Sequence, residues 1–493
     1  MPTQGFLSFP LFHPSQIDWD NLVTQINRGN RLALAEKRSR YSPSSSSGFP
    51  QFPPDLVLRD YQREAIINWF KNHGRGTLKM ATGSGKTITA LAIATELYQR
   101  IGLKILLIIC PFRHLVTQWE KEAKRFNLLP ILAFENASDW QNILTQQLYL
   151  LNHNLQEFLT VIVTNSTFIT DRFQSLIPYF HPKTLIVGDE AHNLGTPRFL
   201  SVLPSSIGLR LALSATPERH FDDGGTELLI DYFGKVLQPE FTIGEAIKKG
   251  ALVEYNYYPI MVELTYEEAI KYARITQKIG WAISDGEDIE YSPRLRSLLL
   301  QRARLVAVAE NKLIALRNLM RERREMKPTL FYCGDGNVSQ NTRQLEAVTQ
   351  ILGKELNYKV NTYTAETPTE ERERIKRQLV DGELDGIVAI RCLDEGVDIP
   401  MIANAVILAS STNPRQFIQR RGRILRPYPG KKEANIFDMI VLPPLMERDA
   451  WAVERSLLKR ELARLVEFAR LAKNSDSAYN LLGKIYNLIE GED

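Results

Sequence analysis

The sequence predicts an α/β protein made of two tandem domains, each built on a mainly parallel sheet. From about residue 56, short and nearly continuous apolar runs alternate with longer helical stretches, which is typical of strands buried on both faces of a parallel sheet. The pattern pauses in a mainly helical region and then resumes, which indicates a second sheet of similar construction. With 493 residues, 44% of them apolar, the chain can bury two cores of ordinary domain size.

The expected strands are short apolar runs on either side of the helical region. In the first domain they are TLKMA, KILLIIC, TVIVTN, TLIVGDE and LRLALSA, at residues 77–81, 104–110, 160–165, 184–190 and 209–215. In the second domain they are PTLFYCG, VNTYTA, DGIVAI and NAVILAS, at residues 328–334, 360–365, 385–390 and 404–410. Between the two sets, apolar residues recur at helical spacing from Leu295 to Met320, predicting one long amphipathic helix that ends before Pro328.

We expect four parts along the chain. The run 41–54, YSPSSSSGFPQFPP, is rich in Ser and Pro and predicts a flexible tether. The run VEYNYYPIMVEL, at 253–264, can either close the first domain or open the second. The parts are an N-terminal segment with its linker (1–55), a first domain (56–250), a second domain (251–445) with a helical insertion at about 265–327, and a helical C-terminal extension (446–493).

The composition says more about the cellular compartment of the protein than about its binding partner. The net charge of +4 is small for this length, so a nucleic-acid surface has to come from local clusters of Lys and Arg. Cys110, Cys333 and Cys392 each lie in or beside an apolar run, which favours reduced thiols. No apolar run approaches the roughly 18 residues that span a bilayer, and the N-terminus lacks a secretory signal. We therefore expect a cytoplasmic protein without a membrane partner.

The stretch MATGSGKTITALAIATELYQR, at 80–100, has the pattern of a phosphate-binding loop. A strand precedes it, and a helix with an apolar stripe follows and is expected to end at Gly102. The glycines let backbone N–H groups converge on phosphate oxygens, Lys86 reaches the β- and γ-phosphates, and the Thr87 hydroxyl can bind Mg²⁺. One departure is Met80, which stands where the general pattern has glycine. The residues predicted to contact the nucleotide here are Thr82, Gly83, Ser84, Gly85, Lys86 and Thr87.

An acidic pair follows the predicted strand TLIVGDE. Such a strand delivers Asp189 and Glu190 to the carboxyl edge of a parallel sheet, where open α/β sheets bind ligands. Asp189 would hold magnesium, directly or through water, and Glu190 would orient and deprotonate the attacking water. Taken alone, an acidic pair after a strand is as often a solvated turn, and the phosphate loop upstream favours the catalytic interpretation.

These motifs, in this order, resemble those of superfamily 2 helicases and translocases of the DEAH-lettered kind, from about residue 56 to residue 444. The resemblance implies two RecA-like domains, ATP and Mg²⁺ as cofactors, and ATP hydrolysis as the reaction. In LRDYQREA, Gln62 resembles the residue that reads the adenine edge. In LSATPER, Ser214 and Thr216 would link hydrolysis to movement of the domains, together with His192 of the DEAH run.

The second domain carries two further elements of the family. In DEGVDIP, the resemblance implies that Asp398 approaches the ribose. In QFIQRRGRILRP, it implies that Gln419, Arg423 and Arg426 face the nucleotide across the cleft between the domains, with the two arginines as arginine fingers. An arginine of this kind accelerates phosphoryl transfer by about 10³ to 10⁵.

Two other elements of the first domain resemble those that hold one nucleic-acid strand. They are CPFRHLVTQW and VTNSTF, whose candidate phosphate contacts are Arg113, Thr164 and Thr167. The wording of AIRCLDEGVDIP and NPRQFIQRRGRILRP is similar to the branch that contains XPB, the phage UvsW helicase and restriction-enzyme motors. That branch implies movement on double-stranded or branched DNA. The flanking segments are too short for a usual nuclease domain, so we expect partner proteins that supply a nuclease or target recognition, in a bacterial defence, restriction or repair assembly.

Two alternatives stay open from the sequence. One is an ATP-gated DNA clamp or scaffold that recruits partners with little translocation. The other is an RNA helicase, since the same motifs permit RNA remodelling.

Overall fold

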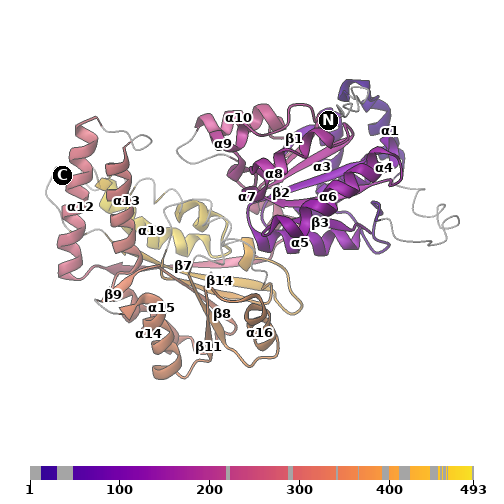
Figure 1. The fold of residues 1–493 in the computed structure, drawn as a ribbon. Coiled ribbons are helices and arrows are strands. Elements are labelled where there is room, and N and C mark those ends of the chain that lie inside the picture. Colours follow the sequence, from indigo (N-terminus) through magenta and orange to yellow (C-terminus); the bar gives the residue numbers. More distant parts are fainter. Residues whose placement is uncertain are drawn as a thin grey trace. The chain divides into compact units, whose positions relative to one another are not determined.

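In a computed structural model, the chain forms two compact units, Met1–Thr242 and Ile243–Asp493. Each unit contains a six-stranded parallel sheet with helices on its faces (Figure 1), which confirms the predicted pair of α/β domains. The structure describes residues 13–29, 48–217, 223–286, 292–339, 342–364, 366–390, 399–409, 422–442, 444, 454–455, 458, 462 and 465–490.

The first sheet has the strand order β1-β6-β5-β2-β4-β3. Its four central strands are buried at every position, because their apolar runs face helices on both sides. The outer strand β3 is only four residues long, begins with a proline and is partly exposed, and the sequence analysis did not predict it. The strands are β1 (Arg75–Lys79), β2 (Ile105–Cys110), β3 (Pro130–Ala133), β4 (Leu159–Thr164), β5 (Thr184–Asp189) and β6 (Leu209–Ser214).

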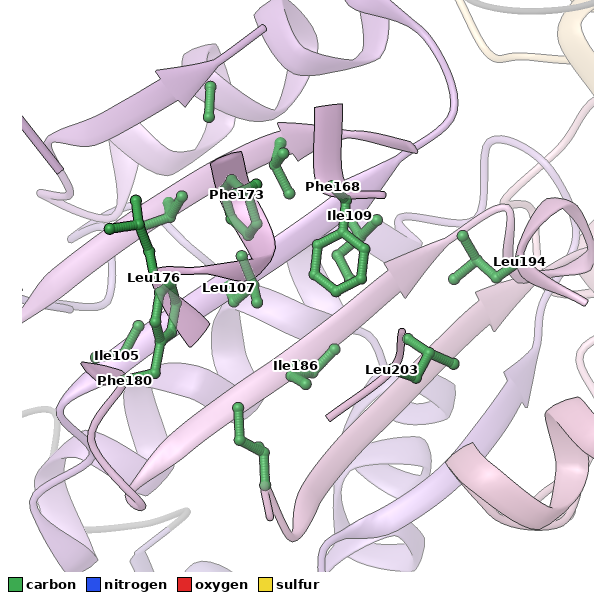
Figure 2. Close-up of a cluster of buried hydrophobic side chains, with 14 of the residues drawn as sticks. Ile105, Leu107, Ile109, Phe168, Phe173, Leu176, Phe180, Ile186, Leu194 and Leu203 are labelled. Atoms are coloured by element: carbon green, nitrogen blue, oxygen red, sulfur yellow. The ribbon is translucent and has the colours of Figure 1, made fainter. Parts of the chain in front are cut away.

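Helices and a dense aromatic core cover this sheet. Ile105, Leu107 and Ile109 of β2 pack with Phe168 and Phe173 on one face (Figure 2). The longer helices are α3 (Asp60–Lys71), α4 (Lys86–Ile101), α5 (Arg113–Arg125), α6 (Ala137–Asn152) and α10 (Asp223–Phe233). The helix α1 (Trp19–Gly29) is as long as α10, and the short helices are η1 (Pro14–Gln16), α7 (Asn165–Phe168), α8 (Asp171–Gln174), η2 (Ile177–Tyr179), η3 (Ala191–Leu194) and α9 (Pro197–Leu200).

The described part of the Ser/Pro-rich run differs from a flexible tether. Phe49 stacks on Tyr98, Phe52 contacts Phe126, and the Gln51 backbone N–H donates to the Phe126 carbonyl (2.9 Å). The two phenylalanine rings provide apolar surface that packs on the first unit, which the serines and prolines of this run do not provide. Residues 48–54 therefore belong to the surface of this unit.

The second sheet has the strand order β11-β12-β8-β13-β14-β7. β7 pairs with β14 in parallel along ten residues, so the run VEYNYYPIMVEL opens the second sheet. The strands are β7 (Glu254–Glu263), β8 (Thr329–Cys333), β11 (Val360–Tyr363), β12 (Gly386–Ile390), β13 (Asn404–Ile407) and β14 (Glu433–Leu442), with a separate hairpin of β9 (Asn337–Ser339) and β10 (Thr342–Arg343).

The prediction of one long helix from Leu295 to Met320 is wrong. The structure has α13 (Pro293–Ala307) and α14 (Asn311–Glu322) instead, because the Glu310 backbone N–H donates to the Glu268 carboxylate (2.9 Å) rather than to the preceding turn. The other helices of this unit are α11 (Ile243–Lys248), α12 (Tyr266–Ser284), α15 (Gln344–Gln350), the π turn η4 (Ile351–Glu355), α16 (Thr369–Val380) and α19 (Ser475–Glu490).

The described C-terminal residues pack on the second unit. The Tyr255 hydroxyl on β7 donates to the Phe468 carbonyl (2.7 Å), and the Phe468 ring also contacts Tyr257. Among the described residues, no helix combines the length and the apolar character needed to cross a membrane. Cys110 and Cys333 are buried free thiols, whereas Cys392 lies outside the described residues.

Candidate functional site

The candidate groups of the first unit gather at the carboxyl edge of its sheet. Lys86 follows the loop after β1, Asp189 ends β5, and Ser214 ends β6. Neighbouring parallel strands end at the same edge, so residues far apart in the sequence become neighbours there. β5 lies beside both β6 and β2, which places the acidic pair in the middle of this edge.

The phosphate loop needs its glycines for backbone geometry. Gly83 and Gly85 have φ angles of 85° and 87°, in the left-handed region where a side chain is strained. A Cβ atom at Gly85 would also lie 2.6 Å from Gln62 Nε2. The helix α4 begins directly after this turn and ends where Gly102 takes a φ angle of 67°, as the sequence predicts.

Side chains of helix α3 bind the backbone of the phosphate loop. The Tyr61 hydroxyl donates to the Ser84 carbonyl (2.7 Å), and Gln62 Nε2 donates to the Gly85 carbonyl (3.3 Å). Gln62 Oε1 accepts from the Arg59 backbone N–H (3.0 Å), so both ends of the amide are bound to the backbone. The Tyr61 ring stacks on Phe241 with 3.7 Å between ring centres. Sequence reasoning missed this pair, because 180 residues separate its members.

The loop has polar groups that fit a phosphate. Thr82 Oγ1 and Ser84 Oγ are buried, and neither has a hydrogen-bond partner among the described residues. Buried polar atoms nearly always have a partner, so two unsatisfied hydroxyls in one loop, at the start of α4, fit an anion with several acceptor oxygens. Thr87 lies in the first turn of the same helix.

Glu190 lies opposite the loop lysine. Lys86 Nζ is 3.5 Å from Glu190 Oε1, and both side chains are largely buried. Glu190 has a φ angle of 44°, which is uncommon for a residue with a side chain and is typical of strained functional positions. The backbone therefore turns sharply at the end of β5 and aims this carboxylate at the loop.

Asp189 is held by a residue that the sequence did not single out. The Trp119 indole N–H donates to Asp189 Oδ2 (2.8 Å), and the Glu190 backbone N–H donates to Oδ1 (2.9 Å). Burial raises the pKa of Asp189 to about 6, and Glu190 adds to this, while Lys86 and the Trp119 N–H oppose it. The only sequence signal for Trp119 is its place in CPFRHLVTQW, in which Arg113 is the only residue predicted to have a function.

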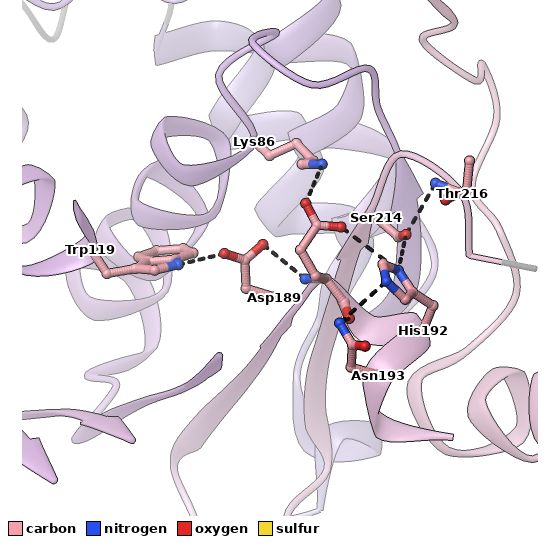
Figure 3. A network of polar contacts seen from close by, with 8 residues as sticks. Lys86, Trp119, Asp189, His192, Asn193, Ser214 and Thr216 are labelled. Carbon is pink, nitrogen blue, oxygen red and sulfur yellow. Dashed lines mark hydrogen bonds and ion pairs between the residues drawn. The ribbon is translucent and has the colours of Figure 1, made fainter. Parts of the chain in front are cut away.

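The predicted coupling residues form a chain of contacts that starts at Glu190 (Figure 3). Glu190 Oε2 is 3.7 Å from His192 Nδ1, and that nitrogen is 3.3 Å from Ser214 Oγ. The Thr216 backbone N–H donates to the same hydroxyl (3.1 Å). The structure thus links the acidic pair after β5 to the Ser-Ala-Thr run after β6.

The three predicted nucleic-acid contacts differ in accessibility. Arg113 is exposed at the start of α5 and forms an ion pair with Glu135 (2.6 Å). Thr164 is buried, and its hydroxyl caps α7 by accepting from the Thr167 backbone N–H (3.4 Å). Thr167 is half-buried in the same turn. The Arg113 side chain is therefore the most accessible of the three.

In the second unit, only part of the predicted site is described. Arg423 and Arg426 are half-buried on either side of Leu425, whose carbonyl accepts from the Val253 backbone N–H (2.8 Å). Asp398 and Gln419 lie outside the described residues.

Comparisons with known proteins agree with this geometry. Residues 55–219 match the family described as "Type III restriction enzyme, res subunit", and residues 311–428 match "Helicase conserved C-terminal domain". The protein described as DNA 3'-5' translocase XPB2, from Sulfurisphaera tokodaii, is 28% identical over 80% of this chain and 83% of its own length. An uncharacterised protein of Mycobacterium tuberculosis is 26% identical over 87% of this chain and 69% of its own length.

A solved structure supports the fold. It is the ATP-dependent Type ISP restriction-modification enzyme LlaBIII bound to DNA, with a TM-score of 0.55 and 19% identity over 85% of this chain. This chain spans about a third of that enzyme, since the match covers 31% of it. The described sheets have the tandem RecA-like arrangement. The chain belongs to superfamily 2 of ATP-dependent helicases and translocases, and within it resembles the XPB and restriction-motor branch.

Proposed function

We propose that this protein is an Mg²⁺- and ATP-dependent translocase that moves on double-stranded or branched DNA. The observation that carries the proposal is the chain of contacts from Lys86 through Glu190 and His192 to Ser214. It joins a loop with unsatisfied hydroxyls to the segment that couples hydrolysis to movement in this family. The similarity to a protein named a DNA 3'-5' translocase supports DNA as the track.

Each residue of the first site has a defined task. Lys86 and the loop from Thr82 to Thr87 hold the phosphates, and Gln62 reads the adenine edge. Glu190 orients water and takes its proton, as general bases do. Asp189 and the Thr87 hydroxyl hold Mg²⁺, which supplies positive charge to the phosphate oxygens when bound. Among the described residues, no cluster of three or more His, Cys, Asp or Glu side chains could hold a metal, as fits a Mg²⁺ bound largely by substrate and water.

The remaining predicted residues assist hydrolysis or couple it to the DNA contacts. Arg423 and Arg426 stabilise the charge that develops on the transferred phosphate, Gln419 assists them, and Asp398 contacts the ribose. Ser214, Thr216 and His192 transmit the change to the DNA contacts. Arg113 binds a DNA phosphate, with Thr164 and Thr167 shaping the turn beside it. We further propose that the protein is cytoplasmic and works with proteins that supply a nuclease or target recognition, in a bacterial defence, restriction or repair assembly.

The test compares ATP turnover with duplex DNA, branched DNA, single-stranded DNA and RNA, and then measures triplex displacement. A motor on duplex DNA shows the largest stimulation with duplex or branched DNA and releases the third strand only with ATP. Tight ATP-dependent DNA binding without displacement would instead support the clamp. Stimulation by RNA alone would overturn the DNA assignment. Lys86→Ala, which removes the phosphate-binding cation, is the inactive control in every assay.

A further inference from the structure

Lys431 joins two segments of the second unit through a single ammonium group. It lies in the turn before β14, and its side chain is half-buried. Its Nζ donates to the carbonyl oxygens of Pro400 (2.9 Å), Ile402 (2.6 Å) and Ile424. An ammonium has three N–H donors, so these contacts use all of them.

The segments that it joins carry functional residues of the proposed site. Pro400 ends the run DEGVDIP, which contains Asp398. Ile424 lies between Arg423 and Arg426, at the end of the helical residues 422–424. The last carbonyls of a helix have no partner within the helix, and a cation at this end is favourable. Lys431 therefore fixes the backbone at the point where the two arginines branch from it.

The Lys431 ammonium places a positive charge near Arg426, which a side chain that only stabilised this turn would not need to do. Burial and the nearby charge of Arg426 lower the pKa of Lys431 to about 8, so the folded unit holds two like charges close together. A side chain that served only to fill this space would do so without that repulsion. The exposed neighbour Lys432 carries the same charge outside this arrangement, which makes it a matched control.

We propose that Lys431 is a positioning residue for the arginine pair, holding Arg423 and Arg426 in the geometry that phosphoryl transfer requires. This inference rests on the proposed function, in which both arginines act on the transferred phosphate. Displacement of a catalytic group by about 1 Å can lower a rate about 100-fold. Lys431 acts through the Ile424 backbone and does not touch the substrate.

The experiment begins with Lys431→Met, which keeps the apolar stem and removes the donors. We expect the DNA-stimulated kcat for ATP to fall about 10- to 100-fold, with KM for ATP within about twofold of the wild-type value. Lys432→Met should keep kcat within about twofold of wild type. A kcat for Lys431→Met within that same range would overturn the proposal.

A double-mutant cycle separates positioning from general stability. If Lys431 acts through the arginines, Lys431→Met has little further effect on kcat in a protein that already carries Arg423→Ala and Arg426→Ala. Multiplicative losses would overturn the proposal. Lys431→Gln, which retains an N–H donor, replaces Lys431→Met if that variant fails to fold, and loss of the folded protein in both would show a structural role only. Wild-type protein without stimulated turnover would instead refute the proposed function itself.

Discussion

The two units hold their functional groups in different ways. In the first unit, the side chains proposed for catalysis contact other side chains directly, while α3 supports the phosphate loop through its backbone carbonyls. Lys86 lies opposite Glu190, and the Trp119 indole holds Asp189.

In the described part of the second unit, lysine ammonium groups donate to backbone carbonyls. Lys312 is buried in α14 and donates to the Leu408 carbonyl just after β13, while Lys431 donates to Ile424. The comparison teaches that substitutions in the first site remove single chemical groups. Substitutions at Lys312 or Lys431 are expected to shift the segments whose carbonyls these lysines bind. The predictions below test this difference, beginning with the largest effect.

The largest effect is expected for Glu190→Gln. The amide keeps the size of the side chain but cannot accept the proton of the attacking water, so turnover should fall about 10²- to 10⁴-fold. Binding of ATP should persist, because Lys86 and the loop are unchanged. Steady-state hydrolysis and binding of a fluorescent ATP analogue measure the two effects separately.

The control for this variant is Glu227→Gln, on the exposed side of α10. It makes the same chemical change outside the site and should hydrolyse ATP at the wild-type rate. Normal hydrolysis by Glu190→Gln would show that another group is the base.

A smaller effect is expected for Trp119→Phe. Phenylalanine keeps the aromatic body but removes the N–H that orients Asp189 Oδ2. Loss of a partner that orients a metal ligand typically weakens metal affinity about 10- to 100-fold. The Mg²⁺ concentration for half-maximal ATP turnover should rise by that factor, while kcat at saturating Mg²⁺ changes less.

Trp140→Phe provides the matched comparison. Trp140 is buried in the same unit, and its indole N–H has no hydrogen-bond partner among the described residues. Its substitution should leave the Mg²⁺ dependence unchanged. An equal shift in both variants would mean that Trp119 acts through packing alone.

The smallest effect concerns pH and the second unit. Above about pH 8, the pKa of Lys431, its ammonium loses one of three donors, and one hydrogen bond is worth about 1 kcal/mol. Stimulated kcat should therefore fall about two- to fivefold between roughly pH 7.5 and 9.5. In Lys431→Arg this step should vanish, because a guanidinium stays charged. A step that persists in the arginine variant would assign it to another group.

Melting temperature distinguishes this effect from unfolding. The pKa of Lys431 is lower in the folded protein than the ordinary lysine value of 10.5, which represents the unfolded chain. Between the two values the unfolded state binds more protons, so the contribution of this group to stability rises with pH. As the pH rises, the titration of Lys431 should therefore lower turnover while it raises the stability of the folded protein.

The sequence predicts all four central strands of the first sheet, because their burial on both faces produces continuous apolar runs such as Ile105–Cys110. In the second sheet it predicts β8, β12 and β13 but misses the inner strand β14, in which apolar and polar residues are mixed. It fails where local pattern and tertiary contact diverge. The edge strand β3 is missed because it is only four residues long and begins with Pro130, which weakens a strand prediction. The break between α13 and α14 arises from the Glu268 carboxylate, which is more than forty residues away along the chain.

The same contrast applies to the candidate site. The loop glycines and the acidic pair are readable because phosphate binding demands residues at fixed spacing. Trp119, Phe241 and Lys431 are not, since each acts through a partner that only folding brings near. Residues that support a site leave a weaker trace in one sequence than residues that perform its chemistry.

The pairing of β7 with β14 has a consequence for synthesis of the protein. The strand that begins at Glu254 emerges from the ribosome long before its neighbour, which begins at Glu433. At about 5 to 20 residues per second, the wait is roughly 9 to 36 seconds. During that time a ten-residue strand rich in tyrosine presents an unpaired edge, the kind of surface that invites aggregation. Shielding of that edge until β14 has been synthesised would therefore protect the nascent chain.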